Sequence, residues 1–337
     1  MTRTVLVARL DNAGDVLLAG PAVRAVAAGA DEVVLLAGPH GADAAGLLPG
    51  VTRVLTWRCP WIVAEPPPVT LEDTRRLVDT IAEQAMDEAL ILTSFHQSPL
   101  PLALLLRLAG VPRIAAISSD YPGSLLDVRH QSTDDQPEPE RALSLARAAG
   151  YDLPNGDDGR LAVRRPLPPS PLEPDGPYVV LHPGASVPAR AWPAERCAAA
   201  VDALSDAGWQ VAVTGGPSER TLTRQVAGRR GIDLGGATTL AKMAAVLAGA
   251  AAVVVGNTGP AHLAAAVGTP VVSLFAPVVP AIRWAPYGVE HVLLGDQDAA
   301  CAGTRARVCP VPGHPCLSSV TAQDVVAAVG KLAGDPA

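Results

Sequence analysis

Apolar segments alternate with segments of helical periodicity along this chain, and this alternation limits the folds open to it more than any other feature. In the first half, the predicted strands occupy 4–10, 32–38, 89–95 and 113–118. The predicted helices between them occupy 16–29, 71–86 and 101–110. Strands separated by helices predict βαβ units, and therefore a parallel sheet covered by helices.

The same alternation restarts after residue 177. Strands are expected at 178–186, 209–216, 232–236, 252–259 and 270–276, and helices at 193–208, 218–228, 240–250 and 260–268. Between the halves, residues 157–177 are rich in proline and charge, as linkers are. A chain of 337 residues is also long for one core and natural for two. We predict an α/β protein with Rossmann-like domains at 1–160 and 177–337, joined by a linker at 161–176.

The charge and composition of the chain exclude several classes of function. A formal charge of −7 and an aromatic content of 3% argue against nucleic acid as a partner. The first apolar run is interrupted by Arg9, unlike that of a signal peptide. The longest apolar stretch, 243–256, is too short to cross a bilayer. We expect a cytoplasmic protein without a transmembrane segment, for which only transient membrane contact is left open.

Two aspartates, Asp11 and Asp15, lie in the turn after the first predicted strand. A phosphatase-type nucleophile at Asp11 requires a second aspartate two residues later, where this chain has Ala13. A dinucleotide-binding loop requires several glycines, and this turn has only Gly14. Two interpretations stay open: an aspartate caps the following helix, or an aspartate is a general base that accepts a hydroxyl proton.

Two turns in the second half favour phosphate binding. Near residue 258, a strand end, a small-residue turn and a helix start follow one another. The backbone N–H groups of Thr258, Gly259 and Ala261 are expected to point outward at the positive end of that helix. A second small-residue turn contains Arg190, whose guanidinium can neutralise phosphate charge. Together the turns predict a diphosphate site that needs no metal.

Four motifs occur in order along the chain: RLDNAGDVLL, HPGAS followed by R-x-W-P, TGGPSE, and NTGPAHLAAAVGTPVVSLF. From about Thr4 to Val329 the chain resembles glycosyltransferase family 9, the ADP-heptose heptosyltransferase-like enzymes. The resemblance implies a GT-B architecture, in which two Rossmann-like domains face a central cleft. The first domain is then on the acceptor side and the second on the donor side. The resemblance also implies inversion at the anomeric carbon without a bound metal.

The resemblance implies roles for individual residues. Asp15 matches the catalytic base, and we add Asp11 and His96 as acceptor contacts because both follow first-domain strands. The implied donor-binding residues are Ser186, Arg190, Glu219, Asn257, Thr258, Gly259 and His262. Many family members have an aspartate where this chain has Asn257, which leaves the donor sugar open.

We therefore predict an inverting, metal-independent glycosyltransferase with Asp15 as general base. It would move heptose or a related sugar from a nucleotide sugar, expected to be ADP-linked, to a hydroxyl of a glycan or a small molecule. No cofactor is expected, because the nucleotide sugar is a substrate. The alternatives are a GT-B sugar-nucleotide epimerase or hydrolase, and a non-catalytic nucleotide-sugar-binding protein.

Cysteines near the end of the chain raise a separate question. Five cysteines in a chain of this length do not suggest a disulfide scaffold. Cys301, Cys309, His314 and Cys316 are candidate soft metal ligands within a short span. Their irregular spacing lacks the paired C-x₂-C of zinc sites, so the sequence leaves metal binding there open.

Overall fold

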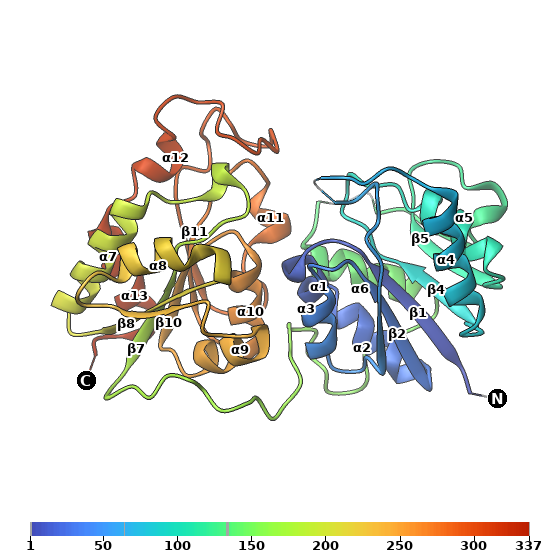
Figure 1. Cartoon of the computed structure of the whole chain (residues 1–337), viewed down its shortest axis with the longest axis horizontal. Helices are drawn as coiled ribbons and strands as arrows, with labels where there is room; N and C mark the ends of the chain where they lie inside the picture. Colours follow the sequence, from blue (N-terminus) through green and yellow to red (C-terminus); the bar gives the residue numbers. More distant parts are fainter. Residues whose placement is uncertain (1, 64, 133–134, 337) are drawn as a thin grey trace. The chain divides into compact units, whose positions relative to one another are not determined.

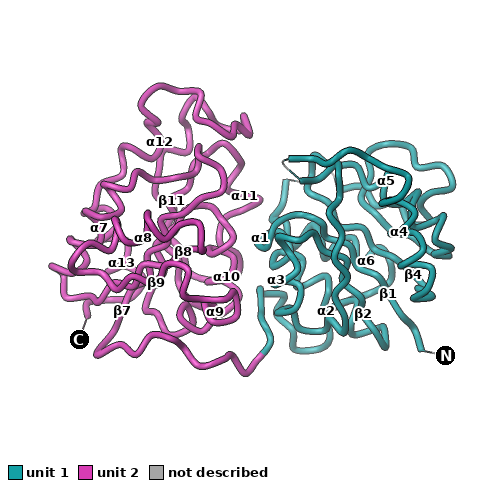
Figure 2. The backbone as a smooth tube through the Cα atoms, in the orientation of Figure 1, with its two compact units in different colours: residues 1–164 teal, residues 165–337 magenta. Residues whose placement is uncertain are grey.

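The computed structural model describes residues 2–63, 65–132 and 135–336. The chain divides into two compact units, Met1–Arg164 and Arg165–Ala337, which are coloured separately in Figure 2. In the described part of each unit, a parallel sheet of six strands has helices packed on it (Figure 1). The predicted α/β fold with two Rossmann-like sheets is confirmed.

The first unit is built around β1, in a sheet with the strand order β3-β2-β1-β4-β5-β6. The strands are β1 (Thr4–Arg9), β2 (Glu32–Ala37), β3 (Arg53–Thr56), β4 (Glu88–Ile91), β5 (Arg113–Ile117) and β6 (Val128–His130). The helices are α1 (Ala13–Leu18), α2 (Gly20–Gly29), α3 (Ala42–Leu47), α4 (Leu71–Ala82), α5 (Leu100–Leu108) and α6 (Glu138–Ala148), with a short 3₁₀ helix at Gly123–Leu125.

Every residue of β1 is buried, because this strand has a neighbour on each side and helices over the sheet. Val7 of β1 is paired in parallel register with Leu35 of β2 and with Leu90 of β4. Since these strands run in the same direction, their carboxyl ends meet at one edge of the sheet. Side chains that follow β1 and β4 are therefore brought together although they are far apart in the sequence.

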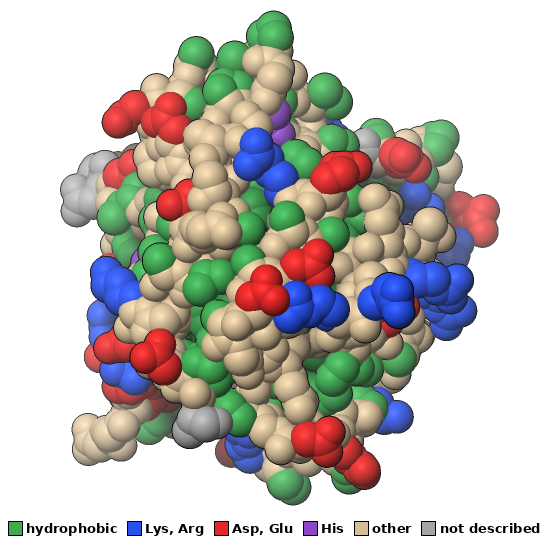
Figure 3. Space-filling view, turned by 90° about the vertical axis from the view of Figure 1, so that its left-hand side faces the viewer, with side chains coloured by type: hydrophobic (Ala, Val, Ile, Leu, Met, Phe, Trp, Pro, Cys, Tyr) green, Lys and Arg blue, Asp and Glu red, His purple; other side chains and the backbone are tan. Residues whose placement is uncertain are grey.

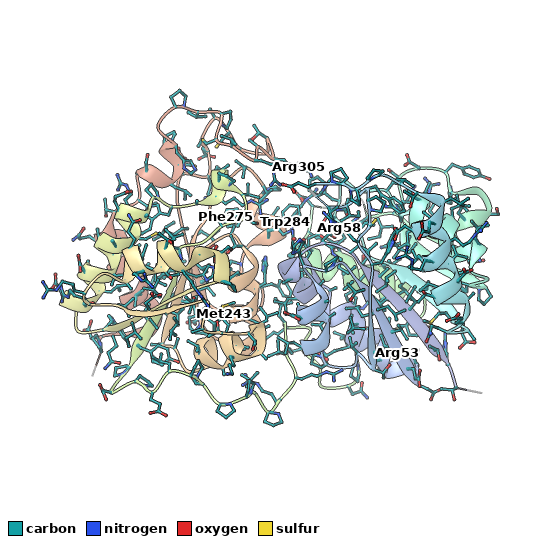
Figure 4. The ribbon with its side chains drawn as sticks, viewed as in Figure 1. Arg53, Arg58, Met243, Phe275, Trp284 and Arg305 are labelled. Carbon is teal, nitrogen blue, oxygen red and sulfur yellow. The ribbon has the colours of Figure 1, made fainter. Side chains whose placement is uncertain are left out.

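The second unit repeats this plan with the strand order β12-β11-β10-β7-β8-β9. The strands are β7 (Tyr178–His182), β8 (Gln210–Gly215), β9 (Ile232–Gly235), β10 (Ala252–Gly256), β11 (Val271–Leu274) and β12 (His291–Leu294). The helices are α7 (Ala194–Asp206), α8 (Arg220–Ala227), α9 (Leu240–Ala248), α10 (Gly259–Val267), α11 (Ala281–Trp284), α12 (Pro315–Ser318) and α13 (Ala322–Ala333), with 3₁₀ helices at Pro188–Arg190 and Pro217–Glu219. Phe275, directly after β11, is fully buried in this unit (Figure 4).

Both sheets reverse their strand order at one point, between β1 and β4 in the first unit and between β7 and β10 in the second. The connections on either side of such a point lead away in opposite directions, which leaves a crevice at the carboxyl ends of the two strands. Ligands of open α/β sheets bind in that crevice. The segments after β1, β4, β7 and β10 are therefore where each unit is expected to carry functional residues.

The prediction of a single helix at 16–29 is wrong. The structure has two helices, α1 and α2, and Ala19 lies between them. Gly20 and Pro21 begin α2. Proline has no N–H with which to continue the hydrogen bonds of α1, but it is well suited to the first turn of a new helix.

The first unit extends to Arg164. The Arg164 N–H donates to the carbonyl oxygen of Leu47 at 2.8 Å, and its Nε donates to that of Leu48 at 3.0 Å. Leu161 and Val163 are buried. The first residues of the predicted linker, 161–164, thus pack on the first unit.

The surface carries charge of both signs. Acidic and basic side chains are interspersed on the face drawn in Figure 3. Among the helices described, none is both long and apolar enough to span a membrane.

Candidate functional site

A buried arginine organises the carboxyl end of β1. Arg9, which is 3% exposed, contacts Asp11 (Nε–Oδ2, 3.0 Å) and Asp15 (Nη2–Oδ1, 3.1 Å). Its Nη1 lies 3.6 Å from Oε2 of Glu138 at the start of α6, and its Nη2 donates to Oγ of Ser94 after β4. Burial opposes the charge of Arg9, but the three carboxylates outweigh it and hold its pKa above the ordinary value.

The two aspartates on Arg9 differ in their surroundings. Asp11 is nearly buried, and its Oδ1 accepts a hydrogen bond from Nε2 of Gln97 at 2.6 Å. Burial, together with the charge of Asp15, raises the pKa of Asp11, while Arg9 and Gln97 act against that shift. Asp15 lies in the first turn of α1 with 22% of its side chain exposed, and Arg9 contacts its Oδ1. Within the described residues, its Oδ2 has no hydrogen-bond partner.

The helix-cap interpretation of the aspartates is wrong. The N-cap of α1 is Asn12, and no side chain caps this helix end. The predicted acceptor contact His96 is exposed in the turn after β4, with its ring edge-to-face with that of Phe95 (centroids 5.4 Å apart). Its charge lowers the pKa of Asp11, so the structure places it within electrostatic reach of the carboxylates.

Sequence reasoning missed Arg9, Gln97 and Glu138. Gln97 is held by the chain itself, since its Oε1 accepts from the N–H of Ser94 at 3.0 Å. The sequence could have indicated Arg9. An arginine at the end of an otherwise apolar, central strand must be buried, and a buried arginine must be paired with acidic groups. Nothing in the sequence indicates that Glu138 reaches the same place from α6.

In the second unit, Glu219 lies against the turn that follows β7. Its Oε2 accepts from the N–H of Gly216 at 2.7 Å and is 4.0 Å from Nε2 of His182. A Cβ atom at Gly184 would overlap the carboxylate of Glu219, so only glycine allows this approach. Burial lowers the pKa of His182 against the opposing charge of Glu219, and its Nδ1 is hydrogen-bonded to Thr214 Oγ1 (3.1 Å).

The turn after β10 only partly matches its prediction. Thr258 is the N-cap of α10, which begins at Gly259. The N–H of Thr258 donates to Gly256 (2.8 Å), and that of Ala261 donates back to Thr258 (3.0 Å). The expectation that both groups point outward is wrong, because the turn itself uses them. Of the three N–H groups expected there, that of Gly259 has no hydrogen bond to a described residue.

Beside this turn, Arg190, Asn257 and His262 come together. Nη1 of Arg190 donates to the carbonyl oxygen of Asn257 at 3.4 Å. Asn257 and His262 are 4% and 5% exposed, yet neither amide atom of Asn257 nor Nδ1 of His262 has a hydrogen-bond partner among the described residues. Burial, and then the charge of Arg190, lower the pKa of His262 to about 4, so its ring is neutral. Buried polar groups of this kind need a partner, which an ordered water or a ligand can supply.

Ser186 is the remaining predicted donor contact. It is exposed and makes no side-chain hydrogen bond to a described residue.

The candidate metal ligands near the end of the chain lie in the second unit. Cys301 and Cys316 are buried neighbours, and burial together with Cys301 raises the pKa of Cys316 to about 12. The Cys309 thiol donates a hydrogen bond to the carbonyl oxygen of Val311, and Nε2 of His314 is hydrogen-bonded to the carbonyl oxygen of Ala189. The described residues contain no group of three or more such side chains placed to hold a metal ion, so these four do not form one.

A sequence model of glycosyltransferase family 9 (heptosyltransferase) matches residues 74–314 of the chain, which is well over half of it. The chain belongs to this family. Lipopolysaccharide heptosyltransferase 1 of Pseudomonas aeruginosa is 36% identical to it over 178 residues, 50% of this chain and 48% of that protein. The chain thus spans about half the length of the curated relatives it matches.

Solved structures share the fold of this family 9 protein. The glycosyl transferase family 9 protein of Veillonella parvula has a TM-score of 0.77 at 15% identity, with 98% of this chain and 97% of that chain covered. The ADP-heptose lps heptosyltransferase II of E. coli has a TM-score of 0.74 at 21% identity, with 98% of each chain covered. These likenesses show a two-domain, Rossmann-like GT-B fold.

Proposed function

We propose that this family 9 chain is an inverting, metal-independent glycosyltransferase that transfers a sugar from an ADP-linked donor to a hydroxyl acceptor. The observation that carries the proposal is the pair of carboxylates on the buried Arg9. Arg9 fixes Asp15 through one oxygen, and the second oxygen, Oδ2, has no partner in the described structure. A positioned carboxylate with a free oxygen is what a hydroxyl acceptor requires of a general base.

In the proposed step, the acceptor oxygen attacks the anomeric carbon of the donor sugar. The O–H proton passes to Oδ2 of Asp15, while the bond between the anomeric carbon and the diphosphate oxygen breaks. ADP leaves with the electron pair of that bond. General-base help of this kind contributes about 10² to 10⁴-fold in rate. Arg9 is a positioning residue in this scheme, because its contact with Oδ1 holds Asp15 in place.

The second unit supplies groups for the donor. Charge builds on the diphosphate as it leaves, and Arg190, the N–H of Gly259 and the positive end of α10 would stabilise that charge. The amide of Asn257 and the neutral ring of His262 have unused hydrogen-bonding atoms for the diphosphate and sugar. Glu219, with the turn at Gly184, would hold the nucleoside. Ser186 and Thr258 stay proposed donor contacts.

The named relatives support the choice of donor. The Pseudomonas aeruginosa relative is a lipopolysaccharide heptosyltransferase, and the E. coli structure is of an ADP-heptose enzyme. We accordingly propose heptose, or a sugar related to it, as the group transferred, and the cytoplasm as the place of reaction. An epimerase or hydrolase would convert the donor without any acceptor, and a binding protein would not turn it over.

Asp15→Asn tests the proposal. Asparagine keeps the size and the contact to Arg9 but cannot accept a proton, so kcat should fall by at least about 10²-fold. The Kd of ADP, measured by calorimetry, should not change. Asp43→Asn is the matched control, because Asp43 is an exposed aspartate in the first turn of α3. Turnover of Asp15→Asn at the level of Asp43→Asn would remove Asp15 from the mechanism.

A further inference from the structure

A loop of the second unit reaches from the cysteine region to the turn that carries Arg190. It lies between Cys301 and Cys316, which are fully buried neighbours. Residues 302–314, between these two ends, contain neither helix nor strand. A compact surface loop whose ends lie close together is an Ω-loop, a kind of loop that frequently takes part in function.

The first part of the 302–314 loop is anchored to the segment after β11. The N–H of Gly303 donates to the carbonyl oxygen of Pro277 at 2.8 Å. The N–H of Arg305 donates to that of Val278 at 2.7 Å. Oγ1 of Thr304 donates to the backbone at the base of the loop, also at 2.7 Å. The start of the loop is thus held in place, and its second part contacts a different element.

That second part holds both backbone polar groups of Ala189. The N–H of Ala189 donates to the carbonyl oxygen of Arg307 at 3.0 Å, and its own carbonyl oxygen lies 3.0 Å from Nε2 of His314. A carbonyl oxygen only accepts, so Nε2 of His314 carries a proton and donates it. Ala189 is 1% exposed, and buried backbone groups need partners. The loop supplies both of them.

The contact with His314 acts on Arg190 through the peptide bond. The carbonyl group of Ala189 and the N–H of Arg190 belong to one planar peptide unit. His314 holds the oxygen of this unit, and the carbonyl oxygen of Val187 accepts from its N–H at 2.8 Å. Two residues further on, Nε1 of the buried Trp192 donates to the backbone just after the loop, at 3.1 Å. Hydrogen bonds thus fix the backbone on both sides of Arg190.

We propose that His314 is a positioning residue for the donor, which holds the peptide unit before Arg190 so that the guanidinium meets the diphosphate. The inference rests on the proposed function, in which Arg190 stabilises the diphosphate. Nη1 of Arg190 contacts the carbonyl oxygen of Asn257 at 3.4 Å, so the side chain is held at both ends. Without His314 the peptide unit takes up further orientations, and only the chains in the held orientation bind the diphosphate fully.

Two substitutions at His314 test this role. His314→Leu removes the hydrogen bond, whereas His314→Gln keeps an N–H donor on a side chain of similar reach. The φ of His314 is 50°, where leucine and glutamine are both strained, so the difference between them reports the hydrogen bond. By calorimetry, the Kd of ADP should rise about two- to tenfold in His314→Leu, the range that one hydrogen bond supports. His314→Gln should bind ADP nearly as the parent chain does. An unchanged Kd in His314→Leu, or equal losses in the two variants, would overturn the proposal.

A control in the same loop and a double-mutant cycle separate positioning from general damage. Thr304→Val also removes a hydrogen bond of the loop, but one that does not involve Ala189, and it should leave the Kd of ADP unchanged. In an Arg190→Ala background, His314→Leu should have no further effect, since the group that it positions is absent. Equal weakening in both backgrounds, or weakening in Thr304→Val to the same extent, would mean that the loop only supports the fold and would overturn the proposal.

The positioning role and the proposed function fail in different ways. If Arg190→Ala binds ADP as the parent does, the donor role of Arg190 is wrong, and the positioning role is overturned with it. If Arg190→Ala weakens ADP binding and His314→Leu does not, the positioning role alone is overturned. If the two substitutions are coupled in ADP binding but no sugar is transferred from ADP-heptose, the positioning role stands and the proposed reaction is wrong.

Discussion

Asn257 stands where the resemblance to family 9 implies an aspartate in many members. Its amide is buried in the turn after β10, where we propose that the donor binds, and neither amide atom has a hydrogen-bond partner in the described residues. An amide donates and accepts hydrogen bonds, whereas a carboxylate only accepts. An unpaired buried polar group costs about 1 to 3 kcal/mol, which is enough to change the ranking of donors tenfold.

Asn257→Asp should therefore change the preference among nucleotide sugars. We expect the ratio of kcat/KM for two sugars to shift by about tenfold or more, and the Kd of ADP to change less. Asn155→Asp, at an exposed turn of the first unit, controls for the added charge. An equal change for all sugars would mean that Asn257 shapes the turn without contacting the sugar.

His262 makes stability depend on pH. Its pKa is about 4 in the folded chain because of burial and of Arg190, below the ordinary value of about 6.5. The unfolded chain therefore binds the proton more readily, and the stability is fully present above about pH 6.5 and is lost as the pH falls toward 4. At pH 5 the proton that His262 binds in the unfolded chain lowers the free energy of unfolding by about 2 kcal/mol.

The measurement is urea unfolding at pH 7 and pH 5. Between pH 7 and pH 5, the free energy of unfolding should fall by about 2 kcal/mol less in His262→Gln than in the parent chain. His291→Gln, at an exposed position of β12, should behave as the parent does. Identical pH dependence in both variants would show that His262 is protonated as easily in the folded as in the unfolded chain.

At the residue scale, the sequence indicated the candidate site residues that follow strand ends. It did not indicate the distant residues that hold their side chains in place. Asp11, Asp15, Arg190 and Asn257 follow strand ends, and strand ends of a parallel sheet can be located from periodicity. Which oxygens are engaged depends on partners far along the chain. Gln97 is 86 residues from Asp11, and a pairing at that distance leaves no pattern in one sequence.

Among the elements, β4 begins at a buried charge that ties three parts of the first unit together. Glu88 is 1% exposed, accepts from Tyr151 OH at 2.7 Å and from Arg3 Nη2 at 3.0 Å, and pairs with Arg113 of β5. Burial, together with Glu88, raises the pKa of Tyr151. This network lies at the amino ends of the strands, opposite the edge that carries Asp15, and its role is to hold the strand starts.

Glu88→Gln should destabilise the first unit without altering chemistry. We expect the free energy of unfolding in urea to fall by about 1 to 3 kcal/mol. This is less than the usual cost of breaking a buried ion pair, because both arginines are partly exposed. The Kd of ADP should stay the same. Glu83→Gln, at the exposed end of α4, is the control. A change in ADP affinity would contradict a purely structural role.

Strands and helices with strong periodicity were predictable, and short edge elements were not. The central strands β1, β7 and β10 are fully buried and read as continuous apolar runs. By contrast, β3 and β12 have four residues each and are half exposed, so their hydrophobic pattern is too weak to distinguish a strand from a loop.

For the whole molecule, activity should survive treatment with EDTA and should not require added magnesium. In the proposed reaction, Arg190 and the positive end of α10 would stabilise the leaving diphosphate in place of a cation. The measurement is the initial rate before and after chelation, with magnesium restored as the control. Inactivation that one metal reverses would point to a metal in the reaction.

The position of Arg9 also affects how a protein of this kind diverges. One guanidinium at the end of a central strand contacts both aspartates, so the proposed proton acceptor is held from β1. Loops elsewhere on this edge of the sheet can therefore vary while Arg9 keeps its contact with Asp15. A substitution at Arg9 would leave three carboxylates without their shared counter-charge. We expect lineages to keep Arg9 unchanged while the sequence of the loops around it varies.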